Sequence, residues 1–299
     1  MSSYYLAEVA PPIRRLRIPL VRDQWMLLML AANEILMGVE TYLAHSISDK
    51  LVFGEWIPII FGPLAGVILL VAGLIGFRKR MTANIIGSLV FLASIIVGLL
   101  GTYFHLMRAV LFSAPYGQQF SIPLLVFGPP MLGPITFALV GILGLSAAWQ
   151  EEPAGSGRLV LPGGRGLQMP FSKTRAYFFL IGLGALLTVL SSAIDHARTG
   201  FVNPWVWVPI FVGVFGATAI LLLGIFDPPT RADLITYTAA MLLLVLTGML
   251  GSGLHIQHDL TSLGVIVGER FIRGSPVMAP MLFANMGALG LIILLDSGD

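Results

Sequence analysis

Apolar stretches long enough to cross a lipid bilayer recur along the whole chain. A membrane-spanning helix needs about 20 predominantly apolar residues, and 57% of this chain is hydrophobic. Only 11% of its residues are charged, compared with about 25% in soluble domains. The sequence therefore predicts an all-α integral membrane protein, embedded in a lipid bilayer, with about eight transmembrane helices. The predicted helices cover residues 24–46, 55–77, 83–107, 121–148, 174–197, 205–226, 235–258 and 276–296.

The chain also contains an internal repeat. His45 and His196 are 151 residues apart, and His105 and His255 are 150 residues apart. The motif WIPI at 56–59 returns as WVPI at 207–210. Each copy holds four predicted helices. We therefore expect two tandem four-helix repeats: a first repeat with an N-terminal segment (1–148), a linker (149–173) and a second repeat (174–299).

The repeat and the basic residues together predict an orientation. Because each copy crosses the membrane an even number of times, both copies enter from the same side and should be related by a pseudo-two-fold axis along the membrane normal. With the N-terminus inside, twelve of the 17 Lys and Arg residues lie on the inner side, among them Arg14, Arg15 and Arg17. Cytoplasmic loops carry such an excess. We predict a cell-membrane protein with its N-terminal segment, both termini and a flexible 149–173 linker in the cytoplasm.

Several classes of function are excluded by composition and motifs. The chain has no cysteine, which excludes disulfides, iron–sulfur clusters and thiolate copper sites. It has no P-loop, dinucleotide fingerprint, HExxH or GxSxG motif. The net charge of +2 follows from the basic residues on the inner side, so no nucleic-acid partner is expected.

All five histidines fall at the outer ends of predicted helices. They are His45, His105, His196, His255 and His258. Neutral imidazole is a common ligand of haem iron, copper and zinc, so all five are candidate metal ligands. The four repeated histidines are also candidate cofactor ligands, since the two in each repeat lie at similar depth and could face each other. The expected cofactor is haem b or a copper-type metal ion, with a quinone as a further possibility.

Small residues accompany the histidines. Gly101 lies one turn before His105, and Gly251 lies one turn before His255. Such positions either leave room for a flat porphyrin or quinone ring, or simply let helices approach closely. His258 follows His255 by three residues, so these two side chains could hold one ion together.

Glu34 falls near the middle of the first predicted helix. A carboxyl group inside a membrane is costly and is a functional hypothesis by default. Glu34 could handle protons that pass towards His45, or it could be protonated and bonded to a neighbour such as Asn285. The second repeat has Ala185 at the matching place. No catalytic residue beyond this proton-handling candidate is predicted.

The layout of eight helices in two four-helix units is similar to membrane subunits of quinol-linked oxidoreductase complexes and to some copper-handling membrane proteins. This is a resemblance of architecture alone. It implies a membrane subunit of an electron-transfer system that carries haem b, a metal ion or a quinol site near the outer face. Its partners would be other subunits or an outer-face redox protein. The alternatives are a transporter or channel for a metal or small ion, and a non-catalytic scaffold whose histidines cap helices.

Overall fold

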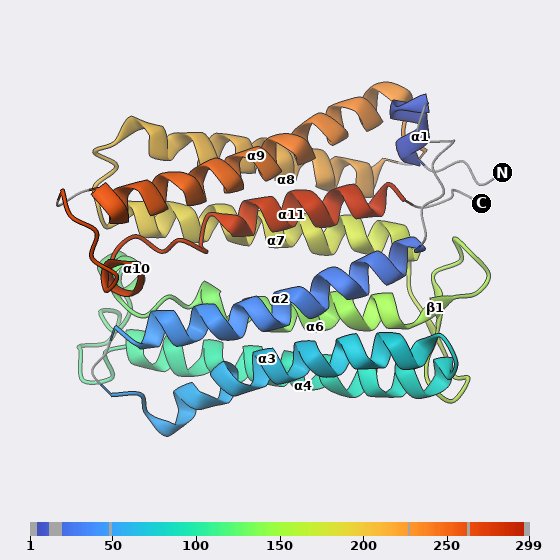
Figure 1. The fold of residues 1–299 in the computed structure, drawn as a ribbon, viewed down its shortest axis with the longest axis horizontal. Helices are drawn as coiled ribbons and strands as arrows, with labels where there is room; N and C mark the ends of the chain where they lie inside the picture. Colours follow the sequence, from blue (N-terminus) through green and yellow to red (C-terminus); the bar gives the residue numbers. More distant parts are fainter. Residues whose placement is uncertain (1–4, 12–19, 48–49, 227, 262–263, 296–299) are drawn as a thin grey trace.

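The structure is a computed structural model that describes residues 5–11, 20–47, 50–226, 228–261 and 264–295. The basic residues Arg14, Arg15 and Arg17 therefore lie outside the described residues. The fold is all-helical apart from one small sheet, and its long helices form two bundles that lie side by side (Figure 1). The first bundle contains α2 (Arg22–His45), α3 (Phe53–Gly76), α4 (Arg80–Ala109) and α6 (Leu132–Ala148). The second contains α7 (Lys173–Ala197), α8 (Trp207–Ile225), α9 (Arg231–Thr261) and α11 (Met281–Ile293).

Among the described residues, six helices are long and apolar enough to cross a membrane. They are α2, α3, α4, α7, α9 and the continuous segment Pro204–Ile225, which joins the short η2 (Pro204–Val206) to α8. Helices in lipid satisfy their own backbone hydrogen bonds, which is why such apolar stretches become helices. The chain is therefore a multi-pass membrane protein by the length and composition of its helices.

The predicted count of eight spanning helices is not confirmed by the described residues. The stretches expected at 121–148 and 276–296 contain helices of only 17 and 13 residues, α6 and α11. In the first stretch, Gly128, Pro129 and Pro130 separate the short α5 (Ile122–Phe127) from α6. Proline lacks a backbone N–H and restricts the residue before it, so the helix is interrupted there. Pro276 and Pro280 likewise precede α11.

Both bundles have the same arrangement of neighbours. In the first, α3 and α6 each pack against both α2 and α4. In the second, α8 and α11 each pack against both α7 and α9. Consequently α2 and α4 occupy opposite corners of one bundle, and α7 and α9 occupy opposite corners of the other. The histidine-bearing helices are these diagonal pairs.

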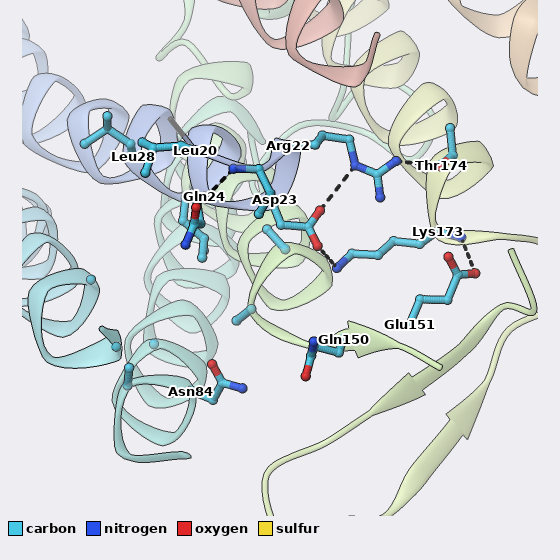
Figure 2. A pocket seen from close by; sticks show the side chains of 18 of the residues that line it. Leu20, Arg22, Asp23, Gln24, Leu28, Asn84, Gln150, Glu151, Lys173 and Thr174 are labelled. Atoms are coloured by element: carbon cyan, nitrogen blue, oxygen red, sulfur yellow. Dashed lines mark hydrogen bonds and ion pairs between the residues drawn. The ribbon is translucent and has the colours of Figure 1, made fainter. Parts of the chain in front are cut away.

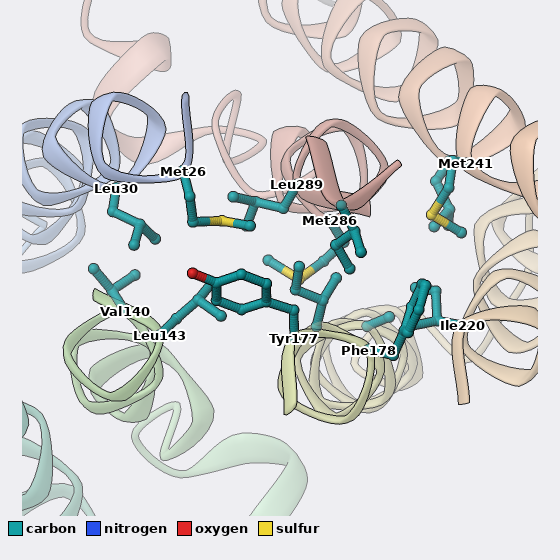
Figure 3. Close-up of a cluster of buried hydrophobic side chains, with 14 of the residues drawn as sticks. Met26, Leu30, Val140, Leu143, Tyr177, Phe178, Ile220, Met241, Met286 and Leu289 are labelled. Atoms are coloured by element: carbon teal, nitrogen blue, oxygen red, sulfur yellow. The ribbon is translucent and has the colours of Figure 1, made fainter. Parts of the chain in front are cut away.

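The two bundles meet through α2 and α6 on one side and α7 and α11 on the other. Figure 3 shows the apolar side chains that fill this junction, where Met26 and Leu30 of α2 and Leu143 of α6 lie near Tyr177 of α7 and Leu289 of α11. All five side chains are at most 2% exposed. The junction is therefore a continuous core between the bundles.

The N-terminal ends of α2 and α7 are linked by polar contacts. Arg22 Nη1 donates a hydrogen bond to Thr174 Oγ1 at 2.6 Å, and Lys173 Nζ donates to Asp23 Oδ2 at 2.6 Å. Arg22 and Lys173 hold matching places at the starts of the two helices, as do Asp23 and Thr174. Each bundle thus supplies a cation to an oxygen of the other. This reciprocity is typical of two-fold contacts.

The 149–173 linker contains a sheet that the sequence did not predict. Strands β1 (Gln150–Glu151), β2 (Arg158–Val160) and β3 (Gly166–Gln168) pair antiparallel in the order β1-β2-β3. Glu151 Oε1 accepts hydrogen bonds from the backbone N–H groups of Gly157, at 2.6 Å, and Lys173, at 2.9 Å. The sheet is therefore anchored to the first residue of α7. The remaining short helices are α1 (Tyr5–Val9), which packs against α9, and α10 (Arg270–Arg273).

Candidate functional site

The repeated histidines all lie at one end of the molecule. His45 ends α2, His196 lies at the last turn of α7, and His105 and His255 lie near the ends of α4 and α9. All four side chains are half-buried. These four helices run in the same direction, since their N-terminal ends all lie at the opposite end of the molecule, the end that also carries the sheet (Figure 1).

Within each bundle the two matched histidines lie against each other. The ring centres of His45 and His105 are 5.9 Å apart, with planes inclined at 65°. Those of His196 and His255 are 6.4 Å apart, with planes inclined at 89°. The histidines come from diagonal helices, so both pairs lie across the axis of a bundle at the end where these helices finish. The expected juxtaposition is present in both bundles.

Backbone carbonyls orient three of the rings. His105 Nδ1 donates to Pro130 O and His255 Nδ1 donates to Pro276 O, both at 2.9 Å. His45 Nδ1 donates to Thr41 O at 2.9 Å. A carbonyl oxygen only accepts, so the proton of a neutral ring sits on Nδ1. In His105 and His255 the Nε2 lone pair is then the one available to a ligand, as in metal sites where a carbonyl fixes the histidine tautomer.

The small residues beside the histidines do not leave room for a large cofactor. A Cβ atom at Gly101 would lie 2.8 Å from Pro134 Cβ, and one at Gly251 would lie 2.9 Å from Pro280 Cβ. Real Cβ atoms essentially never come so close. These glycines therefore serve close helix packing, the second of the two roles weighed from the sequence, and the room beside them is filled by proline.

His258 stands apart from the pairs. Its side chain is exposed, whereas its neighbour Asp259 is fully buried and accepts a hydrogen bond from Ser275 N at 2.9 Å. In the part of the chain that the structure describes, no group of three or more His, Cys, Asp or Glu side chains could hold a metal ion together. Each histidine pair thus offers two nitrogen ligands and no third protein ligand of these types.

Glu34 is fully buried inside the first bundle, where Ser94 of α4 lies beside it. Ser94 Oγ is 2.5 Å from Glu34 Oε1 and 2.8 Å from Phe137 O. A serine hydroxyl has a single proton to donate, so both contacts are hydrogen bonds together only when Glu34 is protonated and donates to Ser94. Asn285, offered from the sequence as one example of a bonded neighbour, has no hydrogen bond to Glu34 here: Glu34 Oε2 and Asn285 Oδ1 both lack a partner among the described residues.

Sequence reasoning missed three groups that shape these sites. Pro130 and Pro276 supply the carbonyls that orient His105 and His255, and their recurrence at matching places was a usable signal. Ser94 was missed because it is 60 residues from Glu34, and nothing in a single sequence pairs side chains across a bundle diagonal.

Comparison with known proteins adds no relatives: no family model, curated protein or solved structure matches this chain. The class that the fold defines is an all-helical, multi-pass membrane protein in a lipid bilayer.

Proposed function

We propose that this chain is an integral membrane subunit of an electron-transfer system that carries a two-histidine centre at the outer end of each bundle. The observation that carries the proposal is the matched pair of imidazole contacts, His45 with His105 at 5.9 Å and His196 with His255 at 6.4 Å. Two imidazoles that share one ion at metal–nitrogen distances of about 2.0–2.1 Å have ring centres about 6 Å apart. Both spacings suit a single ion between the rings.

A compact ion suits the pairs better than haem b does. Pro134 and Pro280 fill the space beside Gly101 and Gly251, where a porphyrin plane next to His105 or His255 would need room. Structural zinc sites take four protein ligands, whereas cuprous ion is stable with two nitrogen ligands, and imidazole suits copper. We therefore favour one copper-type ion per pair, which could pass electrons by cycling between its two oxidation states. A quinol bonded to the two Nε2 atoms is the remaining option.

An absorption spectrum combined with metal analysis of the purified protein tests this proposal. Copper bound in proportion to protein, without haem bands, is the expected result. If the wild-type spectrum shows haem bands and these disappear in the His105→Ala variant, the cofactor is haem b and not a copper-type ion. If the purified protein contains neither metal nor haem but binds a quinol analogue, the histidine pairs form a quinol site.

We further propose that the two bundles are parallel repeats related by a pseudo-two-fold axis along the membrane normal. The reciprocal contacts Arg22 with Thr174 and Lys173 with Asp23 support this relation. The identical carbonyl bonds of His105 and His255 also support it.

The same proposal places the histidine end outside the cell and both termini with the linker sheet in the cytoplasm. The chain has no native cysteine, so single cysteines can report sidedness. Ala154 in the linker and Tyr116 in the outer loop are both exposed. An impermeant thiol reagent applied to intact cells should label the Tyr116→Cys variant and leave the Ala154→Cys variant unlabelled. The reverse pattern would overturn the orientation.

A further inference from the structure

A large cavity lies at the inner end of the molecule, far from the histidines. It has a volume of about 1040 Å³ and is lined by the starts of α2, α4 and α7, by α3 and by the linker (Figure 2). Small-molecule sites commonly occupy about 300–1,000 Å³, so this cavity has room for a substantial ligand. It serves neither histidine pair.

The mouth of the cavity carries a surplus of positive charge. Its charged lining residues are the cations Arg22, Arg80, Lys173 and Arg175 and the anions Asp23 and Glu151. Three of the four cations are engaged: Arg22 and Lys173 bond to Asp23, and Arg175 Nε donates to Gly224 O at 2.9 Å. The surplus of two positive charges favours an anion.

Arg80 is the cation left to meet a ligand. Its side chain is exposed and makes no hydrogen bond or ion pair within the described residues. Asn84 lies one turn further along α4 and Gln150 lies on β1, and the amides of both border the cavity (Figure 2). Arg80 also begins α4, where backbone N–H groups and the helix dipole attract anions. These groups form a set of donors suited to a phosphate.

Deeper in the cavity the same face of α4 becomes apolar. Gly87 and Phe91 continue the face that Arg80 and Asn84 begin, and all four line the cavity. Leu28 of α2 and Leu70 of α3 line it as well. The cavity therefore changes from charged to hydrocarbon-like in the direction of the membrane interior, as a phospholipid does from its headgroup to its acyl chains.

The second bundle has no equivalent arrangement. Arg231 is the first residue of α9, as Arg80 is of α4, yet it lies outside the cavity lining drawn from the described residues. Tyr237 stands 150 residues after Gly87; it is fully buried and its hydroxyl donates to Gly290 O at 2.8 Å. A large side chain thus fills in one bundle the place where glycine leaves space in the other.

We propose that this cavity binds an anionic phospholipid, with the phosphate at Arg80, Asn84 and Gln150 and one acyl chain along Gly87, Phe91 and Leu28. Basic pockets between membrane helices on the cytoplasmic side recognise anionic headgroups in this way. The site is independent of the histidine centres. Its occupant would bridge α4 and the linker sheet, and so stabilise the inner end of the junction between the bundles.

Native mass spectrometry of the delipidated full-length protein tests the proposal with phosphatidylglycerol and phosphatidylcholine as probes. The wild type should bind one phosphatidylglycerol more tightly than phosphatidylcholine. Arg80→Gln should weaken phosphatidylglycerol binding about fivefold, the effect of one basic residue at a membrane surface. Arg231→Gln is the matched control and should bind like the wild type.

A second variant tests the acyl part of the site. A Cβ atom at Gly87 would meet its nearest neighbour, Phe91 Cε2, at an ordinary distance of 4.0 Å. Gly87→Leu should therefore fold, which thermal unfolding checks, and should lose the tight phosphatidylglycerol. Equal binding of both lipids by the wild type, equal losses in Arg80→Gln and Arg231→Gln, or full binding by folded Gly87→Leu would each overturn the proposal. Displacement of the lipid by inorganic phosphate alone would also overturn it, because the site would then recognise a soluble anion.

Discussion

The two bundles are alike at the end that carries the histidines and differ in their middles. At the histidine end each has a histidine pair, a proline carbonyl bonded to Nδ1 and a glycine packed against proline. In the middle, Glu34 and Ser94 of the first bundle form a buried hydrogen bond. The matching places in the second bundle hold Ala185 and Leu244, both buried. A feature kept in both copies points to a shared task, whereas the polar core belongs to the first bundle alone.

The inner junction should give the largest effect of any single substitution. Lys173 is 1% exposed and its ammonium group is paired with Asp23. Asp23→Ala leaves that charge buried beside the Trp149 carbonyl and the Tyr177 ring, without a carboxylate bonded to it, and we expect the free energy of unfolding to fall by about 3–5 kcal/mol. Thermal unfolding in detergent measures this loss of stability.

The reciprocal contact provides the control for that substitution. Thr174→Ala removes one hydrogen bond from Arg22 and leaves its ion pair with Asp23 in place. The expected loss is about 0.5–1.5 kcal/mol. Equal losses in the two variants would show that the junction does not depend on the buried lysine.

Close helix packing in the half of each bundle that carries the histidines should respond alike to substitution. A Cβ at Gly98 would collide with the backbone nitrogen of Ala138, and one at Gly248 would collide with that of Ala284. Gly98→Val and Gly248→Val should each destabilise the protein by about 1–3 kcal/mol. Gly253, also in α9, has no atom within 4 Å of a built Cβ, so Gly253→Ala is the tolerated control. A loss of stability in only one of the two valine variants would contradict the proposed equivalence of the bundles.

The buried polar pair of the first bundle, Glu34 and Ser94, can be replaced by the apolar residues at the matching places of the second bundle. Glu34→Ala leaves a cavity, and Ser94→Leu leaves a buried carboxyl without its partner, so each alone should destabilise the first bundle. The double variant Glu34→Ala/Ser94→Leu reproduces the pair Ala185 and Leu244. It should be more stable than the sum of the single losses by about 0.5–3 kcal/mol. Additive losses in unfolding experiments would mean that the two positions do not correspond.

The sequence predicted features that depend on spacing and missed those that depend on packing. Membrane helices follow from apolar length, and the meeting of His45 with His105 follows from their shared depth in one repeat. The break before α6 was not predicted, because the stretch 121–148 is predominantly apolar, although Pro129 and Pro130 are residues that interrupt a helix. The sequence left the role of Gly101 open, since Pro134 lies 33 residues away and meets it only in the folded bundle.

The number of cuprous ions bound per chain tests the central claim most directly. Metal-free protein in detergent would be titrated in competition with a chromogenic copper(I) chelator. We expect two ions in the wild type, one tight ion in either His105→Ala or His255→Ala, and none in the double variant. Loss of an orienting group near a metal already weakens affinity about 10–100-fold, and loss of a ligand should cost more. His258→Ala should still bind two. A wild type that binds no copper, or a double variant that keeps both ions, would contradict the account.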